Sequence, residues 1–245
     1  MSAGAQPSSS KRYTPIANYV LVHGAYQGGW IWKPVAARLR AAGHTVHAPT
    51  LDGCAERHAQ VRRGITLETH AQELAQVLFY EDLEQVVFVG TSLGGMVMCR
   101  AAELVRERIS RLVFVDALAL LSGERLTDII GTRRPGAYEE TDVTIGRTKT
   151  HAETQLFIDL DAATRRWAVE RYTPHPIAVH EDPVELATFW TLPWSATVIR
   201  CRRSKNPPES HQRRTAARLN AVWHELDAGH YPMLSHPAEL TDLLA

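Results

Sequence analysis

Short apolar runs alternate with longer amphipathic segments along most of the chain. The runs have the length of buried strands, and the segments between them repeat their apolar residues at the three- and four-residue spacing of helices. In the segment 66–80, for example, Leu67, Ala71, Leu74 and Leu78 share one face. The predicted strands are 19–24, 44–49, 85–90, 111–117, 196–201 and 221–229, and the predicted helices are 32–43, 66–80, 93–104, 209–220 and 236–245.

This alternation predicts β-α-β units, which build a mostly parallel sheet of about six strands with helices on both faces. Residues 120–193 interrupt the pattern with helical fragments, turns and many aromatics but no clear strand, and they are too many for a plain loop. We therefore expect a core formed by residues 16–119 and 194–245, with a helical cap of residues 120–193 inserted in it. Residues 1–15 are small and polar and are predicted to be a disordered tail.

Composition narrows the expected partners and compartment. The 245 residues contain 27 Lys and Arg against 27 Asp and Glu, so neither a nucleic-acid nor a membrane-surface partner is expected. No apolar stretch approaches the roughly 20 residues of a membrane span, and the N-terminal residues lack a signal peptide's apolar core. Three cysteines do not form a disulfide framework, which fits a reducing compartment. We expect a cytoplasmic protein, with a homodimer left open.

Residues 88–97, FVGTSLGGMV, carry an apolar strand into Gly-x-Ser-x-Gly and then into a helix. In this context Ser92 is predicted to be a nucleophile on a sharp strand-to-helix turn. Its flanking glycines leave room for a strained backbone, and the following helix directs its first amides toward charge forming at the serine. The alternative is an ordinary strand–loop–helix junction with a serine cap.

A serine nucleophile needs a general base and an oriented imidazole. His230 follows the last predicted strand and is the expected base, although it could be a surface histidine in a turn. Asp116 ends the strand 111–117 and is the expected third member, the alternative being a helix-capping aspartate. The backbone N–H groups of Ala25 and Leu93 are the predicted oxyanion hole. The spacing of the cap histidines gives no metal motif, so no metal is expected.

Aromatic and apolar residues in the cap and beside the predicted site suggest an apolar pocket. Most cap aromatics could equally form the cap's own small core. The candidate pocket-lining residues are Tyr26, Phe157, Trp167, Phe189, Trp190, Tyr231 and Met233.

Taken together, these pieces resemble the α/β-hydrolase superfamily over essentially all of residues 16–245. The segments LVHGAYQGGWIWKPVAARLRAAGHTVHAPTLDG, GITLETHAQEL, VGTSLGGMV and HELDAGHYPML are similar to the branch of plant methylesterases, hydroxynitrile lyases and their small bacterial esterase relatives. The resemblance implies Ser-His-acid ester chemistry without a cofactor, a helical cap, and a sheet that starts at the strand equivalent to the family's third.

The chain departs from this branch in two places. The plant proteins carry an aspartate soon after the penultimate strand, where IRCRRSKNPP places Ser204 here. Some members of the superfamily place the acid one strand earlier, which is the position of Asp116. Lyases that resemble this chain carry a threonine beside the oxyanion loop and a lysine after the catalytic histidine, whereas Gly24 and Tyr231 stand at these positions.

The sequence therefore predicts a serine hydrolase that cleaves a small apolar or aromatic carboxylic ester or lactone through an acyl-enzyme. One alternative is acyl transfer, cyclisation or lyase chemistry on a biosynthetic intermediate at the same site. A second is a ligand-binding member of the fold without catalysis.

Overall fold

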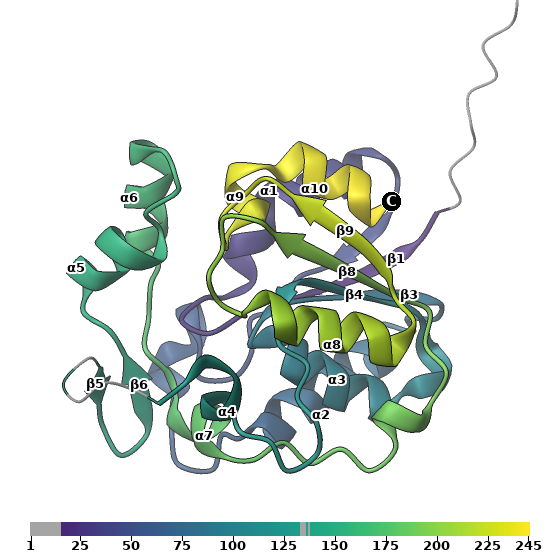
Figure 1. The fold of residues 1–245 in the computed structure, drawn as a ribbon, viewed down its shortest axis with the longest axis horizontal. Coiled ribbons are helices and arrows are strands. Elements are labelled where there is room, and N and C mark those ends of the chain that lie inside the picture. The colour runs from purple at the N-terminus through teal and green to yellow at the C-terminus, as the bar shows by residue number, and fades with distance from the viewer. Residues whose placement is uncertain (1–15, 133–135, 137) are drawn as a thin grey trace, which may run out of the picture.

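A six-stranded sheet in which every neighbouring pair is parallel forms the centre of the protein (Figure 1). The structure is a computed structural model and describes residues 16–132, 136 and 138–245, so the predicted tail 1–15 lies outside the described residues. In spatial order the strands are β2 (Thr45–His47), β1 (Asn18–Val22), β3 (Val86–Ser92), β4 (Ile109–Ala117), β8 (Ala196–Cys201) and β9 (Val222–Leu226). This arrangement confirms the predicted fold class.

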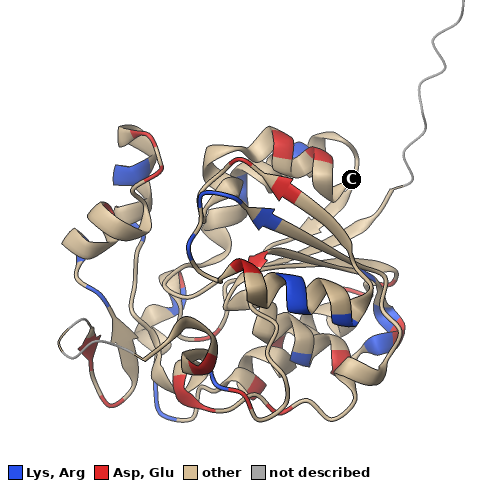
Figure 2. Cartoon of the chain, in the orientation of Figure 1, with Lys and Arg blue, Asp and Glu red and all other residues tan. Residues whose placement is uncertain are grey.

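Helices cover both faces of the sheet (Figure 1). Because successive side chains of a strand point to opposite faces, Val86 and Phe88 of β3 pack in one apolar cluster and Val87 and Val89 in the other. The first cluster is covered by α2 (Leu67–Tyr80), α3 (Gly94–Leu104) and α8 (Glu209–Leu219), and the second by α1 (Lys33–Ala41), α9 (Pro232–Ser235) and α10 (Pro237–Leu244). Charged residues gather on the helices and loops, and the strands carry few of them (Figure 2).

Short 3-10 helices link several of these elements. They are η1 (Gly29–Trp32), η2 (Ala55–Gln60) and η3 (Arg106–Arg108). The helix α2 shows how local sequence sets an element's start, because the Thr66 side chain accepts a hydrogen bond from the Thr69 amide at 3.3 Å.

The segment between β4 and β8 holds short helices and also a small sheet. Its helical elements are α4 (Leu126–Ile130), α5 (Lys149–His151), the π-helix η4 (Ala152–Leu156), α6 (Ala162–Glu170), α7 (Ile177–Glu181) and the 3-10 helix η5 (Phe189–Thr191). Three antiparallel strands accompany them: β5 (Glu139–Glu140), β6 (Thr144–Gly146) and β7 (His175–Pro176). The sequence predicted no strand here because two or three residues are too few to show an alternating pattern. The exact boundary of the cap stays a prediction.

None of the helices in the described part of the chain is long and apolar enough to span a membrane. All three cysteines, Cys54, Cys99 and Cys201, are free thiols and buried.

Candidate active site

Ser92 lies at the carboxyl end of β3, on the turn into α3. Its backbone φ is +51°, which lies in the left-handed region that residues other than glycine rarely adopt. The turn is packed tightly against β1: a Cβ atom on Gly94 would lie 2.3 Å from the carbonyl oxygen of His23. A glycine at position 94 is therefore required, and the turn presents Ser92 at the edge of the sheet.

Ala25 and Leu93 line the same cavity as Ser92. Within the described residues, neither of their amides donates a hydrogen bond to another protein group, so both can serve an incoming oxygen.

The loop that carries Ala25 is held from two sides. The Gln27 side chain accepts a hydrogen bond from the Gly24 amide at 3.2 Å, and the His23 Nε2 atom accepts one from the Leu51 amide at 3.1 Å. Burial lowers the pKa of His23 to about 4, so this ring stays a neutral acceptor near neutral pH.

His230 and Asp116 come together although 114 residues separate them. Asp116 is fully buried at the end of β4, and its Oδ2 atom lies 2.6 Å from Nδ1 of His230. An ionised carboxylate only accepts, so Nδ1 of His230 carries the proton and Nε2 is left as the acceptor. His230 and Ser92 line the same cavity. The catalytic roles of all three residues stay predictions.

Gln212 on α8 is a partner of Asp116 that the sequence analysis missed. Its Nε2 atom donates to Oδ1 of Asp116 at 2.8 Å, and the amide of Cys201 reaches the same oxygen at 3.4 Å. Ser204, which occupies the position of the plant proteins' acid, lies on the cavity wall and donates instead to the Asn206 carbonyl oxygen at 3.0 Å.

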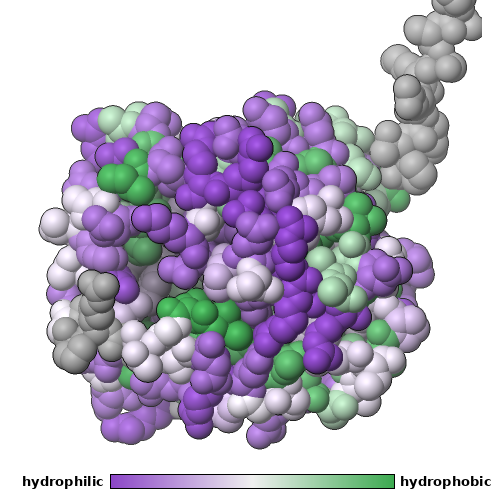
Figure 3. All heavy atoms as spheres, in the orientation of Figure 1, coloured by the Kyte–Doolittle hydropathy of each residue, from purple (hydrophilic) through white to green (hydrophobic). Residues whose placement is uncertain are grey.

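The cavity beside Ser92 has a volume of about 460 Å³ and lies between the sheet edge and the cap. On the side of the molecule seen in Figure 3, apolar side chains gather between α8 and the cap. Tyr26 and Tyr231 line the cavity as the sequence suggested. The other apolar lining residues are Leu118, Leu126, Ile130, Tyr138, Leu156, Ile158 and Pro207, and the charged ones are Arg147, Asp159, Arg203 and Lys205.

Five candidate lining residues lie elsewhere, which corrects the sequence expectation for them. Phe157 packs against the Tyr231 ring at 4.7 Å between centroids, and Trp167 packs against Trp30 at 5.2 Å. Phe189 and Trp190 belong to an aromatic cluster with Trp194. Met233, a residue of α9, is fully buried in the core. The four cap aromatics stabilise the cap and its contacts with the core. Helical periodicity does not distinguish that role from a pocket wall.

The described residues contain no group of three or more His, Cys, Asp or Glu side chains placed to hold a metal ion. A second aspartate, Asp227, lies three residues before His230. Asp227 is exposed and pairs with Arg202 and Arg203 on the surface.

Comparison with known proteins places the chain in a family. The profile of the alpha/beta hydrolase family matches residues 19–243. The carbendazim hydrolyzing esterase of Nocardioides sp. (strain SG-4G) is 34% identical over an alignment of 183 positions, gaps included, that spans 70% of this chain and 74% of that protein. Methylesterase 3 of Arabidopsis thaliana is 28% identical over an alignment of 254 positions, gaps included, that spans 92% of this chain and 93% of that protein.

A solved structure shows the same fold. An extracellular alpha/beta-hydrolase from a Paenibacillus species superposes with a TM-score of 0.78 at 22% identity, covering 93% of this chain and 97% of that one. The sequence match over nearly the whole chain and the shared fold lead to one conclusion: the chain belongs to the alpha/beta hydrolase family.

Proposed function

We propose that this protein is a carboxylic ester hydrolase that works through an acyl-enzyme on Ser92. The observation that carries the proposal is the 2.6 Å contact between His230 and the buried Asp116, made at a cavity that Ser92 also lines. A buried carboxylate is costly unless it is paired, and pairing with a histidine at the edge of the cavity gives it a chemical use. The esterase relatives support ester hydrolysis as the class of reaction.

The proposed reaction proceeds in two acyl-transfer steps. Nε2 of His230 removes the proton from Ser92 as its Oγ attacks the ester carbonyl carbon, and the amides of Ala25 and Leu93 stabilise the oxyanion. Asp116 stabilises the imidazolium, which then gives its proton to the departing alcohol. A water molecule, deprotonated by His230, attacks the acyl-enzyme, and collapse of the second tetrahedral intermediate releases the acid and restores Ser92.

The expected substrate is a small ester or lactone with an apolar or aromatic group. A cavity of about 460 Å³ fits a small ligand, and leucine, isoleucine and tyrosine side chains provide much of its wall. Several relatives are named methylesterases, so methyl esters of aromatic acids are the first substrates to examine.

Cyanohydrin cleavage is the less favoured reading of the same site. Lyases that resemble this chain carry a lysine after the histidine, and Tyr231 occupies that position. Tyr231 is buried, and burial raises its pKa, so the phenol stays neutral and supplies no cation for a departing cyanide. The site therefore favours hydrolysis.

Hydrolysis of p-nitrophenyl esters from acetate to octanoate and of aromatic methyl esters tests the proposal. The wild type should release free acid. In Ser92→Ala and in His230→Ala, kcat should fall by a factor on the order of 10² to 10⁶. A rearranged product without added water would indicate acyl transfer, cyclisation or lyase chemistry. Absence of both turnover and fluorophosphonate labelling at Ser92 would indicate a ligand-binding protein and would refute the proposal.

A further inference from the structure

The side-chain NH₂ group of Gln212 is buried between two hydrogen-bond acceptors. Its Nε2 atom donates to Oδ1 of Asp116 at 2.8 Å and to the carbonyl oxygen of Pro207 at 3.1 Å, and the residue is 1% exposed. Its Oε1 atom is buried and has no hydrogen-bond partner among the described residues. Turning the amide over would bring its oxygen against two acceptors, so the surroundings fix the orientation with the NH₂ group toward Asp116.

These contacts require one kind of side chain. Two acceptors are each given a hydrogen by a group with at least two N–H bonds, and among such groups a primary amide adds no charge beside Asp116. A glutamate offers at most one O–H, and only when protonated. A methionine of similar length offers none.

Building on the proposed esterase function, we propose that Gln212 is a positioning residue for the acid at the end of β4. It holds Oδ1 of Asp116 so that Oδ2 faces His230, and it stabilises the ionised carboxylate. Through Pro207, which lines the cavity, it also ties the loop between β8 and α8 to the acid. The loop where the plant proteins carry their acid thus contacts the acid of this chain through an amide.

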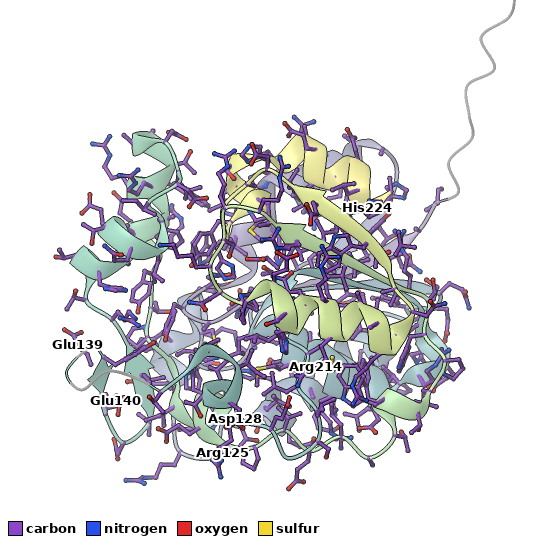
Figure 4. All side chains as sticks on the ribbon, in the orientation of Figure 1. Arg125, Asp128, Glu139, Glu140, Arg214 and His224 are labelled. Carbon is purple, nitrogen blue, oxygen red and sulfur yellow. The ribbon has the colours of Figure 1, made fainter. Side chains whose placement is uncertain are left out.

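Neighbours of Gln212 on α8 fix the helix to the segment that follows Asp116. His211 accepts a hydrogen bond from the Ala119 amide at 3.0 Å. Arg214, labelled beside α8 in Figure 4, makes two hydrogen bonds to Glu124 at 2.6 and 2.7 Å. Both contacts anchor α8 to residues 119–124, which follow Asp116 in the chain.

Other ionisable groups also surround Asp116. His230 faces its Oδ2 atom, and the Cys201 thiol on β8 and the Tyr231 phenol interact with its charge. Burial raises the pKa of both Cys201 and Tyr231, so these two groups stay neutral near neutral pH. Asp159 in the cap adds a further negative charge to the surroundings of Cys201 and Tyr231. Arg214 on α8 forms an ion pair with Glu124.

Removing the amide should make the Asp116 carboxylate more basic. A more basic Asp116 stabilises the His230 imidazolium or itself takes up a proton. In either case, the pair of ionised Asp116 and neutral His230 that the reaction needs forms only at a higher pH. Gln212 does not itself line the cavity, and its contact there is to the backbone carbonyl of Pro207, so its loss should act mainly on kcat.

The test compares Gln212→Met, Gln212→Glu and the matched control Arg214→Met in the full-length protein. For Gln212→Met we expect kcat to fall about tenfold or more at unchanged KM, and the acid limb of kcat/KM to move up by about one pH unit. In Gln212→Glu, the new carboxyl group and Asp116 form a pair that can share a hydrogen bond only while one of the two is protonated. The activity of this variant should therefore decline as the pH rises. Arg214→Met should reduce the free energy of unfolding without moving the acid limb.

The imidazole of His230 gives a readout that does not depend on turnover. Its titration and the resonance of its Nδ1 proton, followed by NMR, should shift in Gln212→Met and stay in place in Arg214→Met. If the protein hydrolyses no ester but this shift occurs, the proposed function fails and the positioning role stands. If Gln212→Met affects only stability, as the control does, or raises KM alone, the positioning role is overturned.

Discussion

His211 on α8 is a buried histidine that the fold holds in its neutral form. Its Nε2 atom accepts the Ala119 amide hydrogen, and its Nδ1 atom lies 3.2 Å from a guanidinium nitrogen of Arg214. Burial, followed by the charge of Arg214, lowers its pKa to about 4. Replacing it with glutamine keeps an acceptor for Ala119 and removes the titration.

The sign of the effect follows from the direction of this shift. The unfolded chain has an ordinary histidine pKa of about 6.5 and binds the proton first, so the contribution of His211 is complete above this value and is lost as the pH falls through about 4. Between about pH 7.5 and about pH 4.5, this single shift removes about 2–3 kcal/mol from the free energy of unfolding. His211→Gln should lack this part of the acid destabilisation.

Urea unfolding of the wild type and His211→Gln at a series of pH values measures the difference directly. As the pH rises from about 4.5 to about 7.5, the free energy of unfolding of the wild type should increase by about 2–3 kcal/mol relative to that of the variant. The comparison cancels the contributions of carboxylates and the other histidines, which both chains share. A constant difference across this range would refute the claim that the fold excludes a proton from His211.

Three further substitutions probe the turn, the cap and the departure from the plant pattern. Gly24→Ala places a Cβ atom 2.8 Å from that of Ser92. The free energy of unfolding in urea should therefore fall by about 1–3 kcal/mol, and fluorophosphonate labelling of Ser92 should slow. An unchanged free energy and labelling rate would contradict this close contact. Phe189→Ala should cost about 3–5 kcal/mol at unchanged KM, whereas a raised KM would return Phe189 to the pocket. Ser204→Ala should keep turnover within about twofold, and a larger loss would give Ser204 a role.

The sheet, the candidate nucleophile and its two candidate partners could be predicted from the sequence because parallel strands end at one edge of a sheet. Ser92 and Asp116 end strands, and His230 follows the last one, so topology alone brings them together. The glycines on either side of Ser92 indicate the turn in the sequence itself, because the backbone there packs so closely against neighbouring backbone segments that only glycine fits.

Other parts of the site depend on contacts that leave no periodic signal. Gln212 is 96 residues from Asp116 and belongs to a helix with arginines on its exposed side, so its pattern is that of an ordinary surface helix. Whether an aromatic side chain such as Phe157 or Tyr26 points into the core or into the cavity depends on its direction, which periodicity does not give. The strands β5, β6 and β7 are too short for any pattern to form.

The central claim is that Ser92 forms an acyl-enzyme and that Asp116 supplies the acid. Intact-mass and peptide analysis after rapid quenching of a reaction with p-nitrophenyl butyrate, for the wild type and for Asp116→Asn, tests both parts. The acyl group should be found on Ser92, and Asp116→Asn should lower kcat by a factor on the order of 10³ to 10⁴. An acyl group on another residue, or an Asp116→Asn variant with the wild-type rate, would contradict the account.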